Sequence, residues 1–204
     1  QRQARRAGSN DSNLCALPHV RARAALLRSI VLQETPDGLY CPAGNFYIDP
    51  WGSVDRAIIT HGHGDHARVG SRAYLCASPG RAVLEQRLEP GTTIESVAYN
   101  QKIQLGGVTV SFHPAGHILG SAQVRVEGDE GVWVVSGDYK READSTCDGF
   151  EPVRCDTFIT ESTFGLPIFR WDPAAEVFAE LIRWWDGNRA AGMTSVLFCY
   201  TLGK

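Results

Sequence analysis

The feature that most constrains this chain is a histidine-rich hexapeptide that directly follows an apolar run. Residues 56–60 have the β-branched content of a buried strand, and they lead into His61-Gly62-His63-Gly64-Asp65-His66. Imidazole nitrogens and carboxylate oxygens both suit zinc, and the two glycines let such close neighbours turn toward one point. A solvated histidine loop or an expression tag is the alternative, but a tag would lie at a terminus and lack the aspartate. The hexapeptide therefore predicts a metal site at a strand end.

A second candidate ligand is His117, which lies in the glycine-flanked segment 114–121 between two apolar runs. A lone histidine is more often a loop or core residue, but beside the hexapeptide it becomes a candidate third nitrogen ligand. His113, four residues earlier, competes for this role. We favour His117 because its flanking glycines permit close approach to a metal. His113 ends a strand, where we expect it to pack or to form hydrogen bonds.

Acids follow two further apolar runs. Asp138 comes after the run 132–136 and Gly137, and Glu161 comes after the run 157–160. Taken alone, each is typical of a turn or strand-end acid. Asp55, just before the strand that precedes the hexapeptide, is a candidate carboxylate for orienting a metal-bound histidine. Because such residues stand at successive strand ends, we expect them to gather at one edge of a sheet.

Short apolar runs alternate with Gly, Pro and Asp turns along most of the chain, which indicates many short strands. Two Ser-Pro or Asp-Pro pairs begin helices, one at 78–88 and one from 172 to about 185. We therefore expect an α/β (α+β) fold. The predicted strands are 39–41, 45–48, 56–60, 108–112, 122–126, 132–136, 157–160 and 195–201.

Composition excludes several classes of protein. With 204 residues, 43% of them hydrophobic and 21% charged, the chain has enough apolar side chain for one globular core. No apolar stretch approaches the roughly 20 residues that a bilayer requires, and none resembles a secretory signal. The six cysteines form no C-x-x-C pair. They predict reduced, mostly buried thiols in a cytoplasmic protein.

Charge divides the chain unevenly. Residues 1–28 hold six arginines and one acid, a charge of +5, while the remainder holds 14 bases and 22 acids, a charge of −8. A basic arm is compatible with nucleic-acid contact. We favour a disordered leader at 1–26, because residues 1–13 have almost no large apolar side chain.

The motifs together resemble a known superfamily. The hexapeptide, the Gly-His pair and the Gly-Asp pair are similar to the metallo-β-lactamase fold superfamily. The strings SGDYK at 136–140 and TESTFG at 160–165 resemble its β-CASP nucleases. The strings GLYCPAG at 38–44, YIDPW at 47–51 and FGLP at 164–167 are most similar to the bacterial ligase-associated DNA exonucleases. The resemblance covers about residues 27–204.

This resemblance implies the N-terminal portion of an αββα sandwich and two zinc ions, with manganese or iron as alternatives. Two residues are assigned supporting roles, Asp55 as an orienting acid and Glu161 as an acid at the rim of the site. The implied ligands are His61, His63 and His117 for the first zinc, Asp65 and His66 for the second, and Asp138 as the bridge.

One departure from the family concerns the second metal. A later histidine completes that site in the family, but this chain has no histidine after His117. We therefore expect an incomplete second site and a truncated chain. The expected division is a leader at 1–26, a metallo-β-lactamase-like domain at 27–194 and the start of a β-CASP segment at 195–204.

The predicted chemistry is hydrolysis of DNA by a two-zinc-activated hydroxide, as in an exonuclease of DNA repair. Asp65 would orient the nucleophile or move a proton. Lys140 and Arg141 would bind a backbone phosphate, although two solvated loop cations explain them equally well. The partners implied are DNA and a DNA ligase, with no membrane. The alternatives are an RNA-processing β-CASP nuclease, a small-molecule hydrolase, which Glu161 argues against, and a fragment that binds metal without activity.

Overall fold

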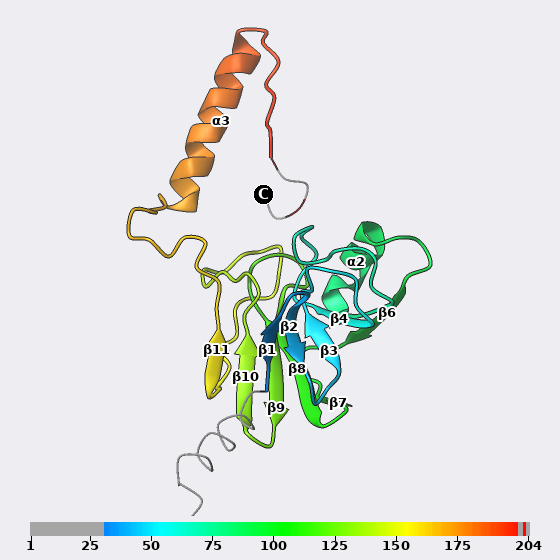
Figure 1. Cartoon of the computed structure of the whole chain (residues 1–204). Helices are drawn as coiled ribbons and strands as arrows, with labels where there is room; N and C mark the ends of the chain where they lie inside the picture. Colours follow the sequence, from blue (N-terminus) through cyan, green and yellow to red (C-terminus); the bar gives the residue numbers. More distant parts are fainter. Residues whose placement is uncertain (1–30, 200–201, 203–204) are drawn as a thin grey trace, which may run out of the picture. The chain divides into compact units, whose positions relative to one another are not determined.

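The computed structural model describes residues 31–199 and residue 202 (Figure 1). The expected leader at 1–26 lies outside the described residues. The described residues form many short strands and few helices, which confirms the α+β class. None of the described helices combines the length and apolarity needed to cross a membrane.

The first sheet has six strands in the order β1-β2-β3-β4-β5-β6. β1 to β3 pair antiparallel, whereas β3 to β6 pair parallel. Parallel strands of one sheet end at the same edge, so the residues that follow β3 and β4 come close together. The bounds are Gln33–Thr35, Gly38–Cys41, Phe46–Ile48, Arg56–Ile59, Ala73–Ala77 and Thr93–Val97.

The second sheet has five strands in the order β11-β10-β9-β8-β7. β7 to β10 form an antiparallel meander, and β11 pairs parallel to β10. The parallel pair places the ends of β10 and β11, and therefore Asp138 and Glu161, at one edge. The bounds of β7 to β11 are Ile103–Leu105, Val108–Pro114, Ala122–Gly128, Gly131–Val135 and Thr157–Ile159.

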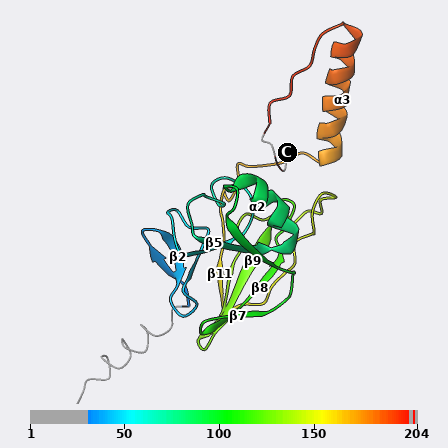
Figure 2. The same cartoon turned by 90° about the vertical axis from the view of Figure 1, so that its right-hand side faces the viewer.

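The two sheets face each other across the main apolar core (Figure 2). Alternate side chains of β3 and β4, such as Phe46 and Ile58, meet Val110, Phe112 and Val124 of the second sheet, and all five are fully buried. The 2.0-residue period of a strand sends the intervening residues to the outer faces. These facing sheets form the centre of the sandwich that the resemblance implied.

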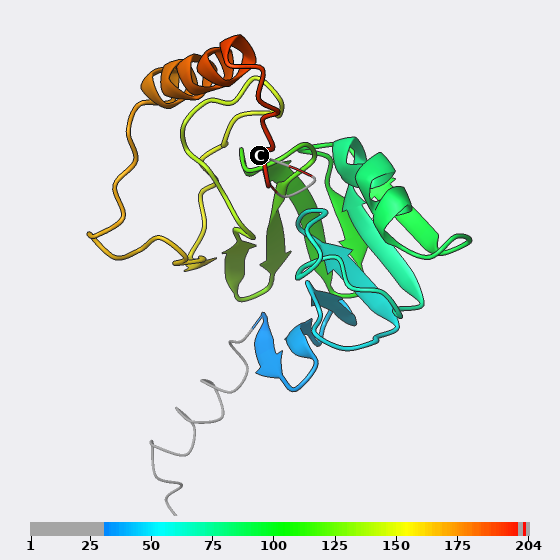
Figure 3. The same cartoon turned by 90° about the horizontal axis from the view of Figure 1, so that it is seen from above.

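Helix α2 (Arg81–Arg87) covers part of the outer face of the first sheet (Figure 3). Its Leu84 packs with Ala57, Ile59 and Tyr74 in a second apolar cluster. The predicted helix from Ser78 begins instead as a 3₁₀ turn, η1 (Ser78–Gly80), without a side-chain cap. Pro79 fits this first turn, because its missing N–H would have no helical partner there.

Helix α3 (Ala174–Ala190) is longer than its sequence pattern predicted and buries none of its side chains. The prediction ended this helix near Trp185, but it continues through Gly187. Gly192 follows the end of the helix with a φ of +71°, and its N–H donates to Arg189 O, an arrangement typical of a C-terminal stop.

The predicted strand 195–201 was wrong over its described part. Residues 195–199 form no strand, because no strand among the described residues pairs with them. The apolar side chains of this stretch lie on the surface: Val196, Leu197 and Phe198 are 78%, 60% and 103% exposed.

Candidate metal centre

The histidine hexapeptide forms a tight turn at the end of β4. His61, 2% exposed, continues the buried strand, and the chain then reverses. The carbonyl oxygen of His63 accepts hydrogen bonds from the backbone N–H groups of His66 (3.2 Å) and Ala67 (2.8 Å). The turn therefore brings three imidazoles onto one side of the strand end.

Helix α2 holds this turn in place from behind. A Cβ atom on Gly62 would lie 2.4 Å from Val83 Cγ1, so only glycine fits against the helix there. Arg87 Nε donates a hydrogen bond to Gly62 O at 3.1 Å. Gly62 is therefore needed for packing against α2 as well as for the turn.

His117 reaches the same edge from the loop between β8 and β9. Gly116 has a φ of +73°, and a Cβ atom there would lie 2.3 Å from Lys140 O. Ser121 Oγ accepts hydrogen bonds from the backbone N–H groups of His117 (3.0 Å) and Ile118 (3.2 Å). This small loop fixes the direction of the His117 side chain.

Asp138 arrives from the end of β10 through Gly137. Gly137 has a φ of +55°, and a Cβ atom there would lie 2.6 Å from Thr60 Cβ. This close approach brings the β10 end against the β4 end, although the two strands belong to different sheets. The site is therefore built across the edge of both sheets.

Four side chains converge on one point. One ligand atom from each of His61, His63, His117 and Asp138 lies within 4.8 Å of all the others. Neighbouring pairs are closer: His61 Nε2 to His63 Nδ1 is 3.0 Å, His63 Nδ1 to His117 Nε2 is 3.3 Å, and His117 Nε2 to Asp138 Oδ2 is 3.6 Å. Ligands at about 2.0–2.2 Å around a tetrahedral zinc are themselves roughly 3.3 Å apart. The donor set and its spacing therefore fit zinc.

His66 lies beside this group and contacts the second oxygen of Asp138. His66 Nε2 is 3.4 Å from Asp138 Oδ1, whereas Asp138 Oδ2 faces His61 and His117. Asp65 Oδ2 is 3.8 Å from His66 Nε2, and its side chain is 73% exposed. Asp138 is thus placed between two groups of donors, as a bridging carboxylate would be.

Electrostatics set the protonation of these groups. Burial, reinforced by the charge on His66, lowers the pKa of His61 to about 2. Burial alone would also lower the pKa of His66, but its contacts with Asp138 and Asp49 outweigh burial and raise this pKa to about 10. The interaction with His66 lowers the pKa of Asp138 to about 2, against the effect of desolvation. A neutral His61 and an ionised Asp138 are the forms that metal binding requires, whereas His66 would have to release a proton to bind a metal.

The acid that orients a histidine is Asp49, and the expectation for Asp55 was wrong. Asp49 Oδ2 is 2.7 Å from His66 Nδ1, and its carboxylate also accepts hydrogen bonds from Thr60 N (2.8 Å) and Thr60 Oγ1 (2.6 Å). Asp55 instead pairs with Arg72 at 3.2 Å, and both side chains are largely exposed. Asp55 lies before β4, at the edge opposite the histidines. Asp49 follows β3 directly, and this strand-end position would have identified it.

The structure places the two competing histidines in different surroundings. His117 joins the convergent group, whereas His113 lies 3.0 Å from Ser111 Oγ through Nε2 and 3.1 Å from Glu151 Oε1 through Nδ1.

Glu161 contacts the segment after Asp138. Its Oε1 accepts a hydrogen bond from Tyr139 N at 3.1 Å, and its Oε2 accepts one from Thr163 N at 3.3 Å. Lys140 Nζ pairs with Asp144 at 3.0 Å, and Arg141 is exposed. Glu161 therefore helps to hold the backbone that carries Asp138, while Lys140 already has an anionic partner.

The described cysteines are unpaired, as expected, but only two are buried. Cys41 and Cys76 lie in the apolar clusters, whereas Cys199 is exposed. Burial raises the pKa of the Cys76 thiol to about 12, which keeps it protonated.

No family model matches the chain. It is 31% identical to a probable DNA ligase of Opitutus terrae over 82% of this chain and 16% of the ligase. It is 23% identical to an endoribonuclease of Yarrowia lipolytica over 93% of this chain and 24% of that protein. It is 32% identical to a ribonuclease of Thermus thermophilus over 59% of this chain and 34% of that protein. The chain thus spans between about a sixth and a third of these relatives.

Proposed function

Because the chain belongs to the metallo-β-lactamase/β-CASP superfamily, we propose that its convergent histidines and aspartate are the metal centre of a nuclease that hydrolyses DNA. The observation that carries the proposal is the convergence of one ligand atom each from His61, His63, His117 and Asp138. Three nitrogens and one carboxylate oxygen form a donor set suited to a hydrolytic zinc.

Two zinc ions are the proposed cofactor, with manganese or iron as alternatives, and the second ion has fewer ligands because no histidine follows His117 in this sequence. Bound metal would supply hydroxide at neutral pH and would screen the charge on the phosphate oxygens. The three imidazoles would hold the first ion, and Asp138 turns its second oxygen toward His66. Asp65 and His66 are the proposed ligands on that side.

The remaining residues of the site orient these groups. Asp49 accepts a hydrogen bond from His66 Nδ1, which leaves His66 Nε2 directed toward Asp138. Because Asp65 is 73% exposed, its carboxylate is available to accept a proton from the attacking water. Glu161 acts through the Tyr139 backbone and keeps the Asp138 loop in place.

DNA is the proposed substrate, and stepwise exonuclease action in ligase-associated repair in the cytoplasm is the proposed role. The long match to a probable DNA ligase supports this choice, because it covers 82% of this chain. A DNA ligase is accordingly the proposed partner.

RNA processing is the second candidate function. It is favoured by the similarity to the Yarrowia lipolytica endoribonuclease and the Thermus thermophilus ribonuclease. The same metal centre serves either substrate, because the phosphodiester is common to both.

The test combines metal analysis with cleavage. Elemental analysis would count the metal ions per chain, and 5′-end-labelled single-stranded DNA and RNA of one sequence would be incubated with the protein. We expect two zinc ions and DNA shortened in single-nucleotide steps. Cleavage of RNA alone would favour the second candidate. One zinc ion without cleavage of either substrate, or no bound metal, would contradict the proposal.

A further inference from the structure

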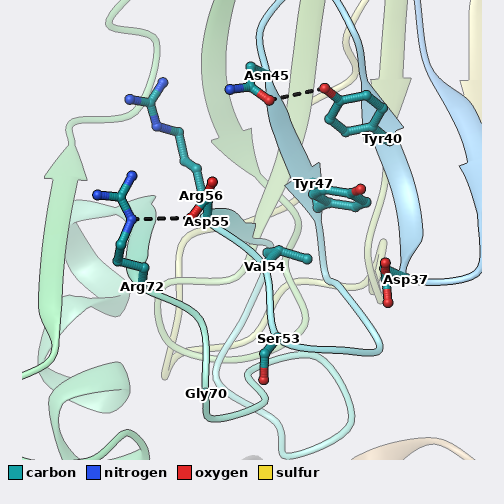
Figure 4. A pocket seen from close by; sticks show the side chains of 10 residues that line it. All are labelled: Asp37, Tyr40, Asn45, Tyr47, Ser53, Val54, Asp55, Arg56, Gly70 and Arg72. Carbon is teal, nitrogen blue, oxygen red and sulfur yellow. Dashed lines mark hydrogen bonds and ion pairs between the residues drawn. The ribbon is translucent and has the colours of Figure 1, made fainter.

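A second feature of the surface lies away from the metal centre, on the outer face of the first sheet. It is a cavity of about 530 Å³, which we call the tyrosine pocket (Figure 4). Its floor carries Tyr40 and Tyr47, and its walls include Asp37, Arg56 and Arg72. The volume lies within the roughly 300–1,000 Å³ of small-molecule sites. None of its lining residues belongs to the histidine–aspartate group.

Sheet register explains why the tyrosines face outward. Tyr40 pairs with Tyr47, Tyr47 with Ala57, and Ala57 with Tyr74, so these four residues form one row on one face. Helix α2 and the residues around it bury the Ala57 and Tyr74 end of this row. Tyr40 and Tyr47 continue the row beyond the helix and are only partly buried. Their ring centroids are 4.6 Å apart at 34°, which gives a broad aromatic surface.

Opposite charges border this aromatic surface. Arg72 is held by Asp55 at 3.2 Å, so these two charges offset each other. Arg56 and Asp37 make no side-chain hydrogen bond or ion pair with any residue between 31 and 199 or with Leu202. Figure 4 shows Arg56 and Asp37 on opposite sides of Tyr47, with the Arg56 side chain extending away from the ring. From one end to the other, the pocket therefore presents a cation, an aromatic face and an anion.

We propose that the tyrosine pocket binds one nucleotide of a single-stranded nucleic acid. The base stacks on Tyr47, a backbone phosphate contacts Arg56, and Asp37 accepts a hydrogen bond from an exocyclic amino group of the base. Stacking on aromatic side chains beside a cation is the common way in which proteins hold unpaired strands. A carboxylate is the natural acceptor for the amino group of cytosine. The proposal rests on the proposed function for its substrate class alone.

The experiment measures binding without cleavage. Fluorescein-labelled 12-nucleotide oligodeoxycytidylate and oligodeoxythymidylate would be titrated with the protein in EDTA, and anisotropy would be recorded. Tyr47→Ala should weaken binding at least about fivefold, because stacking is worth about 1–3 kcal/mol per base. Tyr47→Phe, which keeps the ring, should bind like the wild type.

Charge variants test the two ends of the pocket. Arg56→Ala should weaken binding of both oligonucleotides and reduce the salt dependence by about one phosphate contact. Arg154→Ala removes an exposed arginine outside the pocket. It is the matched control and should leave oligonucleotide binding unchanged. Asp37→Ala, which removes the acceptor oxygens, should abolish the preference for oligodeoxycytidylate, which carries the amino group that oligodeoxythymidylate lacks.

The outcomes separate this proposal from the proposed function. A protein that cleaves DNA but binds both oligonucleotides equally well as wild type and as Tyr47→Ala would overturn the pocket alone. Tyr47-dependent binding without any cleavage would support the pocket and count against the nuclease. Equally tight, Tyr47-dependent binding of a glutamate-rich peptide would overturn the nucleotide assignment, as would failure of the wild type to bind either oligonucleotide.

Discussion

Two regions of this chain use apolar side chains in different ways. The body, residues 31–159, buries aromatic and branched residues such as Phe46, Phe112 and Ile58 completely. The C-terminal segment, residues 160–199, contains Phe178, Trp185 and many other apolar residues, but none of its residues is buried. In the body, two sheets and α2 cover one another. The C-terminal segment has no covering surface among the described residues.

Apolar sequence pattern and burial are therefore separate properties. Strand alternation places one face of a sheet inward only when a second layer faces it. The proposed metal ligands all come from the body, where that layer exists and where close packing fixes each loop. The proposed chemistry therefore depends mainly on the body, and the C-terminal segment contributes through Glu161, which accepts a hydrogen bond from Tyr139 N.

The largest expected effect comes from removing a ligand in the body. His63→Ala or Asp138→Ala should lower metal-dependent hydrolysis by about 10⁴-fold, because each deletes a donor from the convergent group. Initial rates on end-labelled DNA would measure the loss. His113→Ala removes an imidazole outside the group and should retain activity. Undiminished turnover in Asp138→Ala would refute the site assignment.

The free energy of unfolding should also distinguish the body from the C-terminal segment. Phe112→Ala leaves a cavity between the sheets and should lower the free energy of unfolding by about 3–5 kcal/mol. Phe178→Ala alters a side chain that is 61% exposed, and it should change the free energy of unfolding by less than about 0.5 kcal/mol. Urea denaturation of both variants would measure the difference. Equal losses would mean that the C-terminal segment packs as the body does.

Within the body, two aspartates should differ in their effect on metal affinity. Asp49→Asn should weaken metal affinity by about 10–100-fold, because the amide no longer fixes His66 as the carboxylate does. Asp55→Asn makes the same chemical change in an exposed ion pair and should leave the affinity unchanged. Competition with a chelator would measure both constants. A larger loss of metal affinity in Asp55→Asn than in Asp49→Asn would identify Asp55 as the orienting acid instead.

The smallest effect concerns the surface of the C-terminal segment. Because Val196, Leu197 and Phe198 are 60–103% exposed, the protein should bind a hydrophobic dye. Replacing these three residues by serine should reduce the dye fluorescence while leaving the unfolding midpoint unchanged. A monodisperse wild type that binds no dye would show that these side chains are covered in solution.

Several elements were predictable because their signals are local. The runs before His61 and Asp138 are strands as expected, and the glycines beside His117 permit the loop that carries it. β1, β5, β6 and β7 were not predicted. β1, β6 and β7 contain polar residues or are short, and pairing with neighbouring strands stabilises them. β5 is a continuous apolar run that the prediction missed.

The residue types that follow the strands, and with them the superfamily and the candidate donor set, can be read from the sequence. The acid that contacts a histidine of this set is known only from the way in which the strands pair. Asp49 and Asp55 both stand near the hexapeptide strand in sequence, but the parallel pairing of β3 with β4 brings only Asp49 to the edge where His66 lies. The sequence pattern determines which chemical groups follow a strand within a few residues. Which groups of different strands lie close together depends on pairing and packing that involve distant parts of the chain.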